Sequence, residues 1–520
     1  MGKEVKYPVD SANFRRIREE GYLYVDKTEY IHKMTEKGVY YFLARPRRFG
    51  KSLFLDTLAE YFKGNRVLFE GLAIDRLETE VWQNYPVMRF NMTGASFLEK
   101  DDLKGLISNQ LDRQEKEFGF EISDKDINSR FENLIFNISK ETGKKVVVLI
   151  DEYDAPLSSA TGKPELQEIY RSQLHGFYSV LKKTEDSLKF CMLTGVTRYG
   201  KVSVFSGLNN LKDITFDNTY AAICGITEEE LHQYYMEGLQ RLTKEEAISF
   251  EEALRLLKHN YDGYHFSNSL LDVYNPFSIN YAFERLEIND YWCQSGMPTL
   301  LSNTLKDLDF DLEGLNGKEV SEATLMNLSI FKADPIPLFY QTGYLTLKAY
   351  SREDKLFTIG YPNREVEKGL FDSILSVYVP GSNDVAVIIT QMKRSLRNGH
   401  PENFIKILSS FLSDIPGQLH KYVEKYENYY HTIFYCIVKL IGIDIDAEYS
   451  TSEGFIDILI KTENYIYVIE LKVNGTAKDA IRQIEEKHYT SPFESDSRKI
   501  YRIGIGFSNK THTIDSSIIE

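Results

Sequence analysis

Residues 44–54 constrain the fold of this chain more than any other segment. They read A-R-P-R-R-F-G-K-S-L-F and stand between an apolar run at 39–44 and a helical run at 53–62. The predicted order is strand, loop, helix, which brings successive backbone N–H groups and the positive end of a helix dipole to the loop. This arrangement suits the phosphates of ATP or GTP, and it predicts an α/β fold of the P-loop NTPase kind, with a parallel sheet.

The loop supplies a set of predicted nucleotide contacts. They are Arg48, Phe49, Gly50, Lys51, Ser52 and Leu53. We expect Lys51 to reach the β and γ phosphates and the Ser52 hydroxyl to bind Mg²⁺. Arg45 stands where the usual pattern has its first Gly, and a side chain there disfavours positive φ. The loop must therefore enter differently, and Pro46 is expected to set that entry by fixing its own φ.

A second segment, V-V-V-L-I-D-E-Y-D at 146–154, complements the loop. Its five apolar residues predict a strand buried on both faces of a parallel sheet, which places Asp151 at the carboxyl end, where such sheets bind ligands. Asp151 is expected to hold Mg²⁺ through water, and Glu152 to orient or deprotonate the attacking water. A third predicted strand, 190–198, carries Thr194, which could sense the γ-phosphate.

Composition narrows the class of protein. A chain of 520 residues is too long for one core, so two to four domains are expected. The four cysteines are widely spaced and form no metal-binding pattern, which suggests a reducing compartment. The start of the chain is polar and no apolar run approaches eighteen residues, so we expect a cytoplasmic protein without a membrane partner. The net charge of −15 does not by itself attract nucleic acid.

The pattern after residue 225 changes from alternating strands and helices to helices. Thr227 and Glu230 form a predicted capping box. A helix end, a Gly and a β-hairpin follow at 338–363, an order that suits a winged-helix module. The function of such a module would be DNA contact or regulation of the ATPase. The simpler alternative is a packing lid. The predicted divisions are 1–225 for the nucleotide domain, 226–335 for a helical lid, 336–395 for the winged-helix-like and connecting segment, and 396–520 for the last domain.

The last domain has the predicted order αβββαβ. Its elements are a helix at about 416–440, strands at 445–451, 454–461 and 465–473, a helix at 476–489 and a strand at 499–507. Because side chains alternate along a strand, Glu470 and Lys472 point the same way, and Asp457 lies on the paired strand across a tight hairpin.

These three polar side chains converge between two mainly apolar strands, which carries a desolvation cost. A divalent cation offsets that cost, because Asp457 and Glu470 are hard oxygen ligands for Mg²⁺. Lys472 would then hold the nucleophilic water or the scissile phosphate, and Gln483 on the following helix could assist. The alternative is an exposed strand face with an ordinary Glu–Lys neighbour pair.

This constellation resembles the PD-(D/E)XK nuclease superfamily, through G-F-I-D, I-E-L-K and A-I-R-Q-I. The resemblance matches Asp457, Glu470 and Lys472 to the three core positions and implies a restriction-endonuclease-like fold. It also implies a further metal-binding acid on the first helix, Glu427 or less surely Glu424. Glu448 on the first strand competes for that role.

The whole chain is similar to a bacterial family with an AAA-ATPase-like amino-terminal domain and this nuclease-like carboxyl-terminal domain. The segments that carry the similarity include R-P-R-R-F-G-K-S-L, I-D-E-Y-D-A-P-L, F-S-G-L-N-N-L and Y-W-C-Q-S-G-M-P-T-L-L. The phosphate loop of that family also tends to lack the first Gly, which accounts for Arg45.

These features predict an ATP-dependent or ATP-gated, Mg²⁺-dependent nuclease acting on DNA. One alternative is a nucleotide-dependent signalling switch whose nuclease-like domain only binds a partner. Another is a ring-forming homo-oligomer in which Arg198, or an Arg from 45–48, acts across a subunit interface. Residues 400–520 hold 13 Lys plus Arg and 18 Asp plus Glu, so the charge of this region does not support DNA binding.

Overall fold

The computed structural model divides the chain into two compact units. One unit comprises Met1–Thr304 with Leu315–Glu365, and the other Leu305–Gly314 with Val366–Glu520. The residues that the structure describes are 5–122, 126–199, 204–205, 208, 210–292, 312–326, 335–378, 385–413, 429–442, 447–449, 458–508 and 513–520. No helix in these ranges is both long enough and apolar enough to cross a membrane.

The first unit is built on a parallel sheet of strand order β2-β3-β4-β1-β5. The strands are β1 (Tyr40–Ala44), β2 (Val87–Asn91), β3 (Val146–Asp151), β4 (Leu188–Gly195) and β5 (Lys212–Asp213). All five residues of β1 are buried, as are the first five of β3, because helices cover both faces of the sheet. The parallel sheet predicted from the apolar runs is confirmed.

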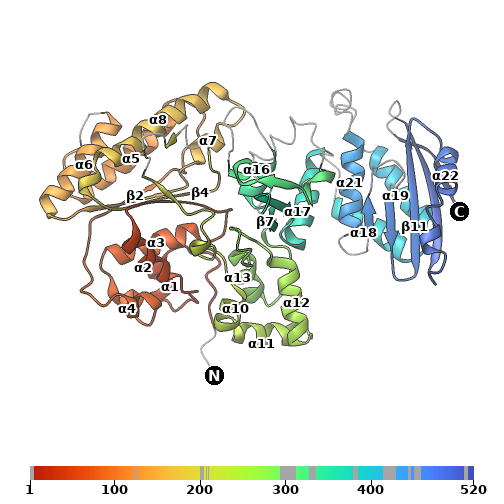
Figure 1. Ribbon diagram of the computed structural model, residues 1–520, viewed down its shortest axis with the longest axis horizontal. Coiled ribbons are helices and arrows are strands. Elements are labelled where there is room, and N and C mark those ends of the chain that lie inside the picture. The colour runs from red at the N-terminus through yellow and green to blue at the C-terminus, as the bar shows by residue number, and fades with distance from the viewer. Residues whose placement is uncertain are drawn as a thin grey trace. The chain divides into compact units, whose positions relative to one another are not determined.

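Helices lie on both faces of this sheet (Figure 1). One face carries α1 (Phe14–Glu19), α2 (Thr28–Lys37), α3 (Lys51–Phe62) and α4 (Ala73–Leu77). The other carries α5 (Asp102–Glu117), α6 (Ile127–Thr142), α7 (Ala155–Ser159) and α8 (Pro164–Lys183). Since α3 follows β1 directly, its first turn lies at the carboxyl ends of the strands.

The chain after residue 225 is helical, as predicted. The helices are α10 (Glu228–Tyr234), α11 (Met236–Glu245), α12 (Phe250–Tyr261) and α13 (Pro276–Arg285). The capping box is present: the Thr227 hydroxyl accepts from the Glu230 amide, and the Glu230 carboxylate accepts from the Thr227 amide. Tyr7, near the amino terminus, packs into the core of this helical region.

A small antiparallel sheet of order β6-β8-β7 completes the first unit. Its elements are β6 (Glu319–Ser321), α15 (Glu322–Met326), α16 (Pro335–Thr342), β7 (Thr346–Ser351) and β8 (Leu356–Gly360). The predicted sequence of helix, turn and hairpin is therefore observed at α16, β7 and β8. The third strand, β6, was not predicted, because three residues carry too short a pattern to recognise.

The second unit contains a mixed sheet of order β13-β12-β11-β10-β9. Its strands are β9 (Ala447–Tyr449), β10 (Ile458–Lys461), β11 (Tyr465–Val473), β12 (Lys499–Ser508) and β13 (Thr513–Ile519). Its helices are α17 (Arg364–Tyr378, which begins in the first unit), α18 (Val385–Arg397), α19 (Pro401–Ser413), α21 (Tyr429–Gly442) and α22 (Ala477–Glu486). Strands β11 and β12 are parallel, and the other neighbours are antiparallel.

The predicted order αβββαβ is present in α21, β9, β10, β11, α22 and β12, and β13 adds one edge strand beyond it. Two glycines in β12 let α22 pack closely. A Cβ on Gly504 would lie 2.4 Å from the Ala477 carbonyl oxygen, and one on Gly506 would lie 3.0 Å from the Ala477 amide nitrogen. This close packing brings the side chains of α22 to the end of β11 that carries the Glu-x-Lys pair.

Candidate functional site

The loop between β1 and α3 has the backbone of a phosphate-binding turn. Arg48 and Gly50 both have positive φ, at 68° and 95°, and Gly50 is the N-cap of α3. No side chain caps this helix terminus, so the first amide groups of α3 face the loop without an internal acceptor. A helix end of this kind attracts an anion.

Lys51, the first residue of α3, is buried beneath the loop. Its Nζ donates to the carbonyl oxygens of Arg45 at 3.0 Å and Pro46 at 3.1 Å, and lies 3.9 Å from Oε1 of Glu152. The ammonium group therefore lies between the loop backbone and the acid that follows β3.

The side chain of Arg45 stabilises the loop and is not exposed to a ligand. Only 1% of it is exposed, and its guanidinium donates to the carbonyl oxygens of Thr215 at 2.8 Å and Tyr220 at 3.2 Å. It also lies over the Phe266 ring, 4.3 Å from the centroid. A side chain held in this way does not reach a neighbouring subunit, so the part of the ring-forming alternative that used Arg45 is not supported.

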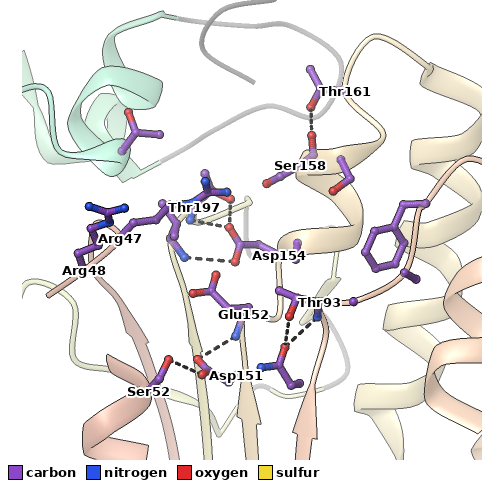
Figure 2. Close-up of a pocket in the computed structure, with 18 of the residues that line it drawn as sticks. Arg47, Arg48, Ser52, Thr93, Asp151, Glu152, Asp154, Ser158, Thr161 and Thr197 are labelled. Atoms are coloured by element: carbon purple, nitrogen blue, oxygen red, sulfur yellow. Dashed lines mark hydrogen bonds between the residues drawn. The ribbon is translucent and has the colours of Figure 1, made fainter. Parts of the chain in front are cut away.

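Asp151 joins three segments of the chain at the carboxyl end of β3. Its Oδ2 accepts from the Ser52 hydroxyl at 2.6 Å (Figure 2). Its Oδ1 accepts from the Thr194 hydroxyl at 2.6 Å. Ser52 and Asp151 are 99 residues apart in the sequence. The structure thus brings together the hydroxyl and the carboxylate that the sequence predicted as Mg²⁺ ligands, and it places Thr194 beside them.

Glu152 points into the same space from a strained backbone. Its φ is 52°, in the left-handed region that a residue with a side chain seldom adopts. Burial raises the pKa of its carboxyl group above the ordinary value, and the nearby Lys51 opposes that rise. A strained backbone and a raised pKa are both features that cluster at functional sites.

Asp154 is a member of this site that the sequence interpretation left without a role. It is buried, and its carboxylate accepts from the backbone amides of Val196 at 3.2 Å and Thr197 at 2.7 Å, and from the Thr197 hydroxyl. The neighbouring Gly195 leaves room for it, since a Cβ there would lie 2.4 Å from Oδ1 of Asp154. Asp154 therefore clamps the end of β4 to the segment after β3.

These groups line a cavity of about 670 Å³ at the carboxyl edge of the sheet (Figure 2). Arg47, Ser52, Thr93, Glu152 and Thr197 contribute polar walls. Further lining comes from later in the chain, at Trp292, Thr342 and Tyr344.

Of the remaining predicted contacts, Arg48 also lines this cavity, whereas Phe49 and Leu53 line a smaller hollow on the other side of the loop. Phe49 is buried against Tyr264 and Phe266, with ring centroids 4.7 and 5.2 Å away, and the Arg48 guanidinium lies 3.8 Å from the Phe277 ring centroid. The smaller hollow, of about 80 Å³, adjoins the loop here. Its lining, largely apolar, includes Val25, Phe49, Gly50, Leu53, Ile226, Tyr235 and Pro276.

The second unit brings together three of its predicted catalytic side chains. Lys472 Nζ lies 3.0 Å from Oε1 of Glu470, which is buried on β11, and it also donates to Oε1 of Gln483 on α22. The Gln483 amide in turn donates to the Tyr489 hydroxyl at 3.4 Å, a contact that the sequence interpretation did not include.

The other predicted metal ligands of this unit lie beyond what the structure describes. Asp457, Glu427 and the alternative Glu424 are outside the described residues, and no side-chain position is described for Glu448. Among the described residues, no group of three or more His, Cys, Asp or Glu side chains is arranged to hold a metal ion.

Comparison with known proteins gives two family matches and one full-length relative. Residues 8–205 match the family described as predicted AAA-ATPase, and residues 425–517 match the PD-(D/E)XK nuclease superfamily. The chain is 33% identical over 523 residues to a protein of Azotobacter chroococcum mcd 1, described as an uncharacterized protein in the vnfD 5′ region. The alignment covers 99% of each chain.

Proposed function

This chain belongs to an AAA-ATPase-like family and carries a PD-(D/E)XK nuclease superfamily domain at its carboxyl end. From that premise we propose that its first unit is an ATPase and that nucleotide binding there gates a Mg²⁺-dependent nuclease in the second unit. The observation that carries the first half is the cluster of Ser52, Asp151 and Thr194 next to the amino terminus of α3. The observation that carries the second half is the contact of Lys472 with Glu470 and Gln483.

The loop geometry supports ATP as the ligand of the first unit. The amide groups at the start of α3 would hold the phosphates, and Lys51 would exchange its loop carbonyls for phosphate oxygens. Ser52 and Asp151 fit a Mg²⁺ ion, because each offers a hard oxygen at the phosphate end of the site, and the ion would neutralise phosphate charge.

Hydrolysis would then depend on Glu152. Its carboxylate faces the cavity beside Lys51, where a water molecule could lie in line with the γ-phosphate. Glu152 takes a proton from that water, the water oxygen bonds to the γ-phosphorus, and the bond between the γ-phosphorus and the bridging oxygen breaks. ADP leaves with the bridging oxygen, and Thr194, whose hydroxyl donates to Asp151, would sense the loss of the γ-phosphate.

The second unit supports phosphodiester hydrolysis. Glu470, with Asp457 as its proposed partner, would hold Mg²⁺, which supplies a more acidic bound water and stabilises charge on the phosphate. Lys472 would position the attacking water or the scissile phosphate, and Gln483, which accepts from its ammonium group, would keep it oriented.

Cleavage and ATP hydrolysis should be measured together on the purified full chain. Phosphate release and plasmid or single-stranded DNA cleavage, each with Mg²⁺, are compared for wild type, Lys51→Ala and Asp457→Ala. We expect Lys51→Ala to lose ATP binding and nucleotide control of cleavage, and Asp457→Ala to lose cleavage while retaining ATP hydrolysis. Equal cleavage by all three proteins would reject the proposal.

The charge of residues 400–520 favours a second candidate function. With 13 basic and 18 acidic residues, this region lacks the positive excess of a typical DNA-binding domain. In this alternative the protein is a nucleotide-dependent switch, and the nuclease-like unit binds a protein partner. It predicts slow ATP turnover, no cleavage and no Mg²⁺ binding by Asp457 and Glu470, which calorimetry with wild type and Glu470→Gln would test.

A further inference from the structure

A second groove opens at the end of the first unit's sheet that is opposite the nucleotide loop. It has a volume of about 370 Å³ and includes Lys189 near the start of β4, whereas the nucleotide cavity lies at the carboxyl ends of the strands. Its walls come from α2, the end of α3, the last residue of α4 and the segment 78–85 that follows it. The proposed ATPase and nuclease chemistry uses none of these residues.

The groove is acidic. Glu36, Glu78 and Glu80 line it, against one lysine, Lys189, and one histidine, His32, whose Nε2 lies 3.4 Å from Oε1 of Glu36. Glu78 is oriented by the Tyr61 hydroxyl, which donates to its Oε2 at 2.8 Å. The Lys189 ammonium group lies 5.3 Å from the centroid of the Tyr85 ring, so a cation already occupies an aromatic face within the groove.

The groove also has an aromatic wall and an apolar rim. Tyr61 and Trp82 pack edge to face with centroids 5.1 Å apart. Val81 is 87% exposed and Leu77 is 43% exposed, both in the lining, so that apolar side chains face solvent directly beside the carboxylates. Exposed apolar side chains next to a groove are a common mark of a protein interaction site.

We propose that this groove binds a segment of a partner protein in which basic and apolar side chains alternate. Charge complementarity selects the partner: Lys or Arg side chains meet Glu78 and Glu80, and their neighbours cover Leu77 and Val81. Aromatic rings lining a carboxylate pocket favour a cationic side chain over a neutral one. The same carboxylates repel the phosphates of nucleic acid.

The probe is a fluorescent peptide of alternating Arg and Leu, titrated into the full chain and followed by anisotropy at low and high salt. We expect saturable binding that is weakened about tenfold in the double variant Glu78→Gln/Glu80→Gln. Val81→Ser should also weaken it. A matched double variant outside the groove, Glu141→Gln on α6 with Glu165→Gln on α8, should bind as wild type does, and ATP hydrolysis should be unchanged in all of these proteins.

Tryptophan emission locates the bound peptide. The chain has two tryptophans, so Trp292→Phe leaves Trp82 as the sole indole, and its emission should change as the peptide binds. Three results would overturn the proposal: equal loss of affinity in the matched control variant, equal affinity for a peptide with Glu in place of Arg, or unchanged Trp82 emission at saturation.

Discussion

The backbone amide of Arg198, just beyond β4, donates a 2.6 Å hydrogen bond to Oε1 of Gln341 on α16. Gln341 is buried, and its own amide group donates to the Leu325 carbonyl oxygen at 2.8 Å. The segment that follows the Thr194 strand is therefore anchored to the module that contains the small sheet. This contact connects the module to the segment that follows the strand carrying Thr194.

Gln341→Ala should lower the turnover of ATP more than its binding. The substitution removes the acceptor that fixes the backbone after β4, while Lys51 and the loop amides stay in place. Small displacements of catalytic groups are costly, so we expect about a tenfold lower kcat with a nearly unchanged Kd. Phosphate release and nucleotide titration separate the two quantities, and Gln240→Ala on the exposed face of α11 serves as the control. A loss of binding equal to the loss of turnover would show that Gln341 only supports the fold.

Glu152→Gln should abolish ATP hydrolysis and retain ATP binding. The amide cannot accept the proton of the attacking water, and general-base removal lowers rates by about 10²–10⁴-fold. Because burial raises the pKa of Glu152, the wild-type rate should fall on the acid side at a higher pH than an ordinary Glu would give. Emission from Trp292, which lines the cavity, reports ATP binding in a Trp82→Phe background. Retained hydrolysis in Glu152→Gln would assign the base to another group.

The sequence was sufficient where an element depends on local pattern. The apolar runs of β1 and β3 located the carboxyl edge of the sheet, where the Ser52 hydroxyl donates to Asp151 and Lys51 lies 3.9 Å from Glu152. The helix α22 was likewise found from its pattern, and Thr476 and Asp479 form a capping box at its start.

The sequence was insufficient where a role depends on partners far along the chain. The Arg45 guanidinium donates to the carbonyl oxygens of Thr215 and Tyr220, which are 170 and 175 residues away in the sequence. No local pattern around Arg45 could predict these partners. Asp154 acquires its role only when β3 and β4 are side by side. Its carboxylate oxygens accept hydrogen bonds from backbone amides that lie more than 40 residues later in the sequence. The edge strand β13 was missed because T-I-D-S-S-I-I mixes polar residues into the strand pattern.

Glu365→Gln should remove a pH dependence of stability in the first unit. Glu365 is 1% exposed; its Oε1 accepts from the amides of Tyr291 and Trp292, and its Oε2 accepts from the Ser278 hydroxyl at 2.8 Å. Burial raises the pKa of Glu365 to about 7. Between pH 4.5, the ordinary pKa of a glutamate, and about pH 7, the folded state therefore keeps a proton that the unfolded state has released.

The sign follows from proton linkage. The contribution of Glu365 to the free energy of unfolding is fully present below pH 4.5 and is lost as the pH rises through about 7, by up to about 3 kcal/mol. Glutamine does not titrate, so the stability of the variant should not change in this way. Relative to wild type, the variant should therefore gain stability as the pH rises from roughly 5 to 8. Urea unfolding at several pH values measures the difference, with the exposed Glu353→Gln as control. A constant difference across this range would contradict the prediction.

Lys472→Ala should remove Mg²⁺-dependent cleavage, and Gln483→Ala should reduce it. Lys472 is held between Glu470 and Gln483, so the loss of Gln483 leaves the ammonium group present but less well oriented. Removing the ammonium group itself removes its stabilisation of a developing anion, so the cleavage rate should fall about 10²–10³-fold, by analogy with other preorganised donors. Loss of orientation alone should cost less, about tenfold, and Gln483→Glu should restore part of the rate because it keeps the acceptor for Lys472. The rates of linear and nicked plasmid formation distinguish these cases, with ATP hydrolysis as the control for folding. Unchanged cleavage in Lys472→Ala would place the phosphodiester chemistry outside this unit and favour its role as a partner-binding module.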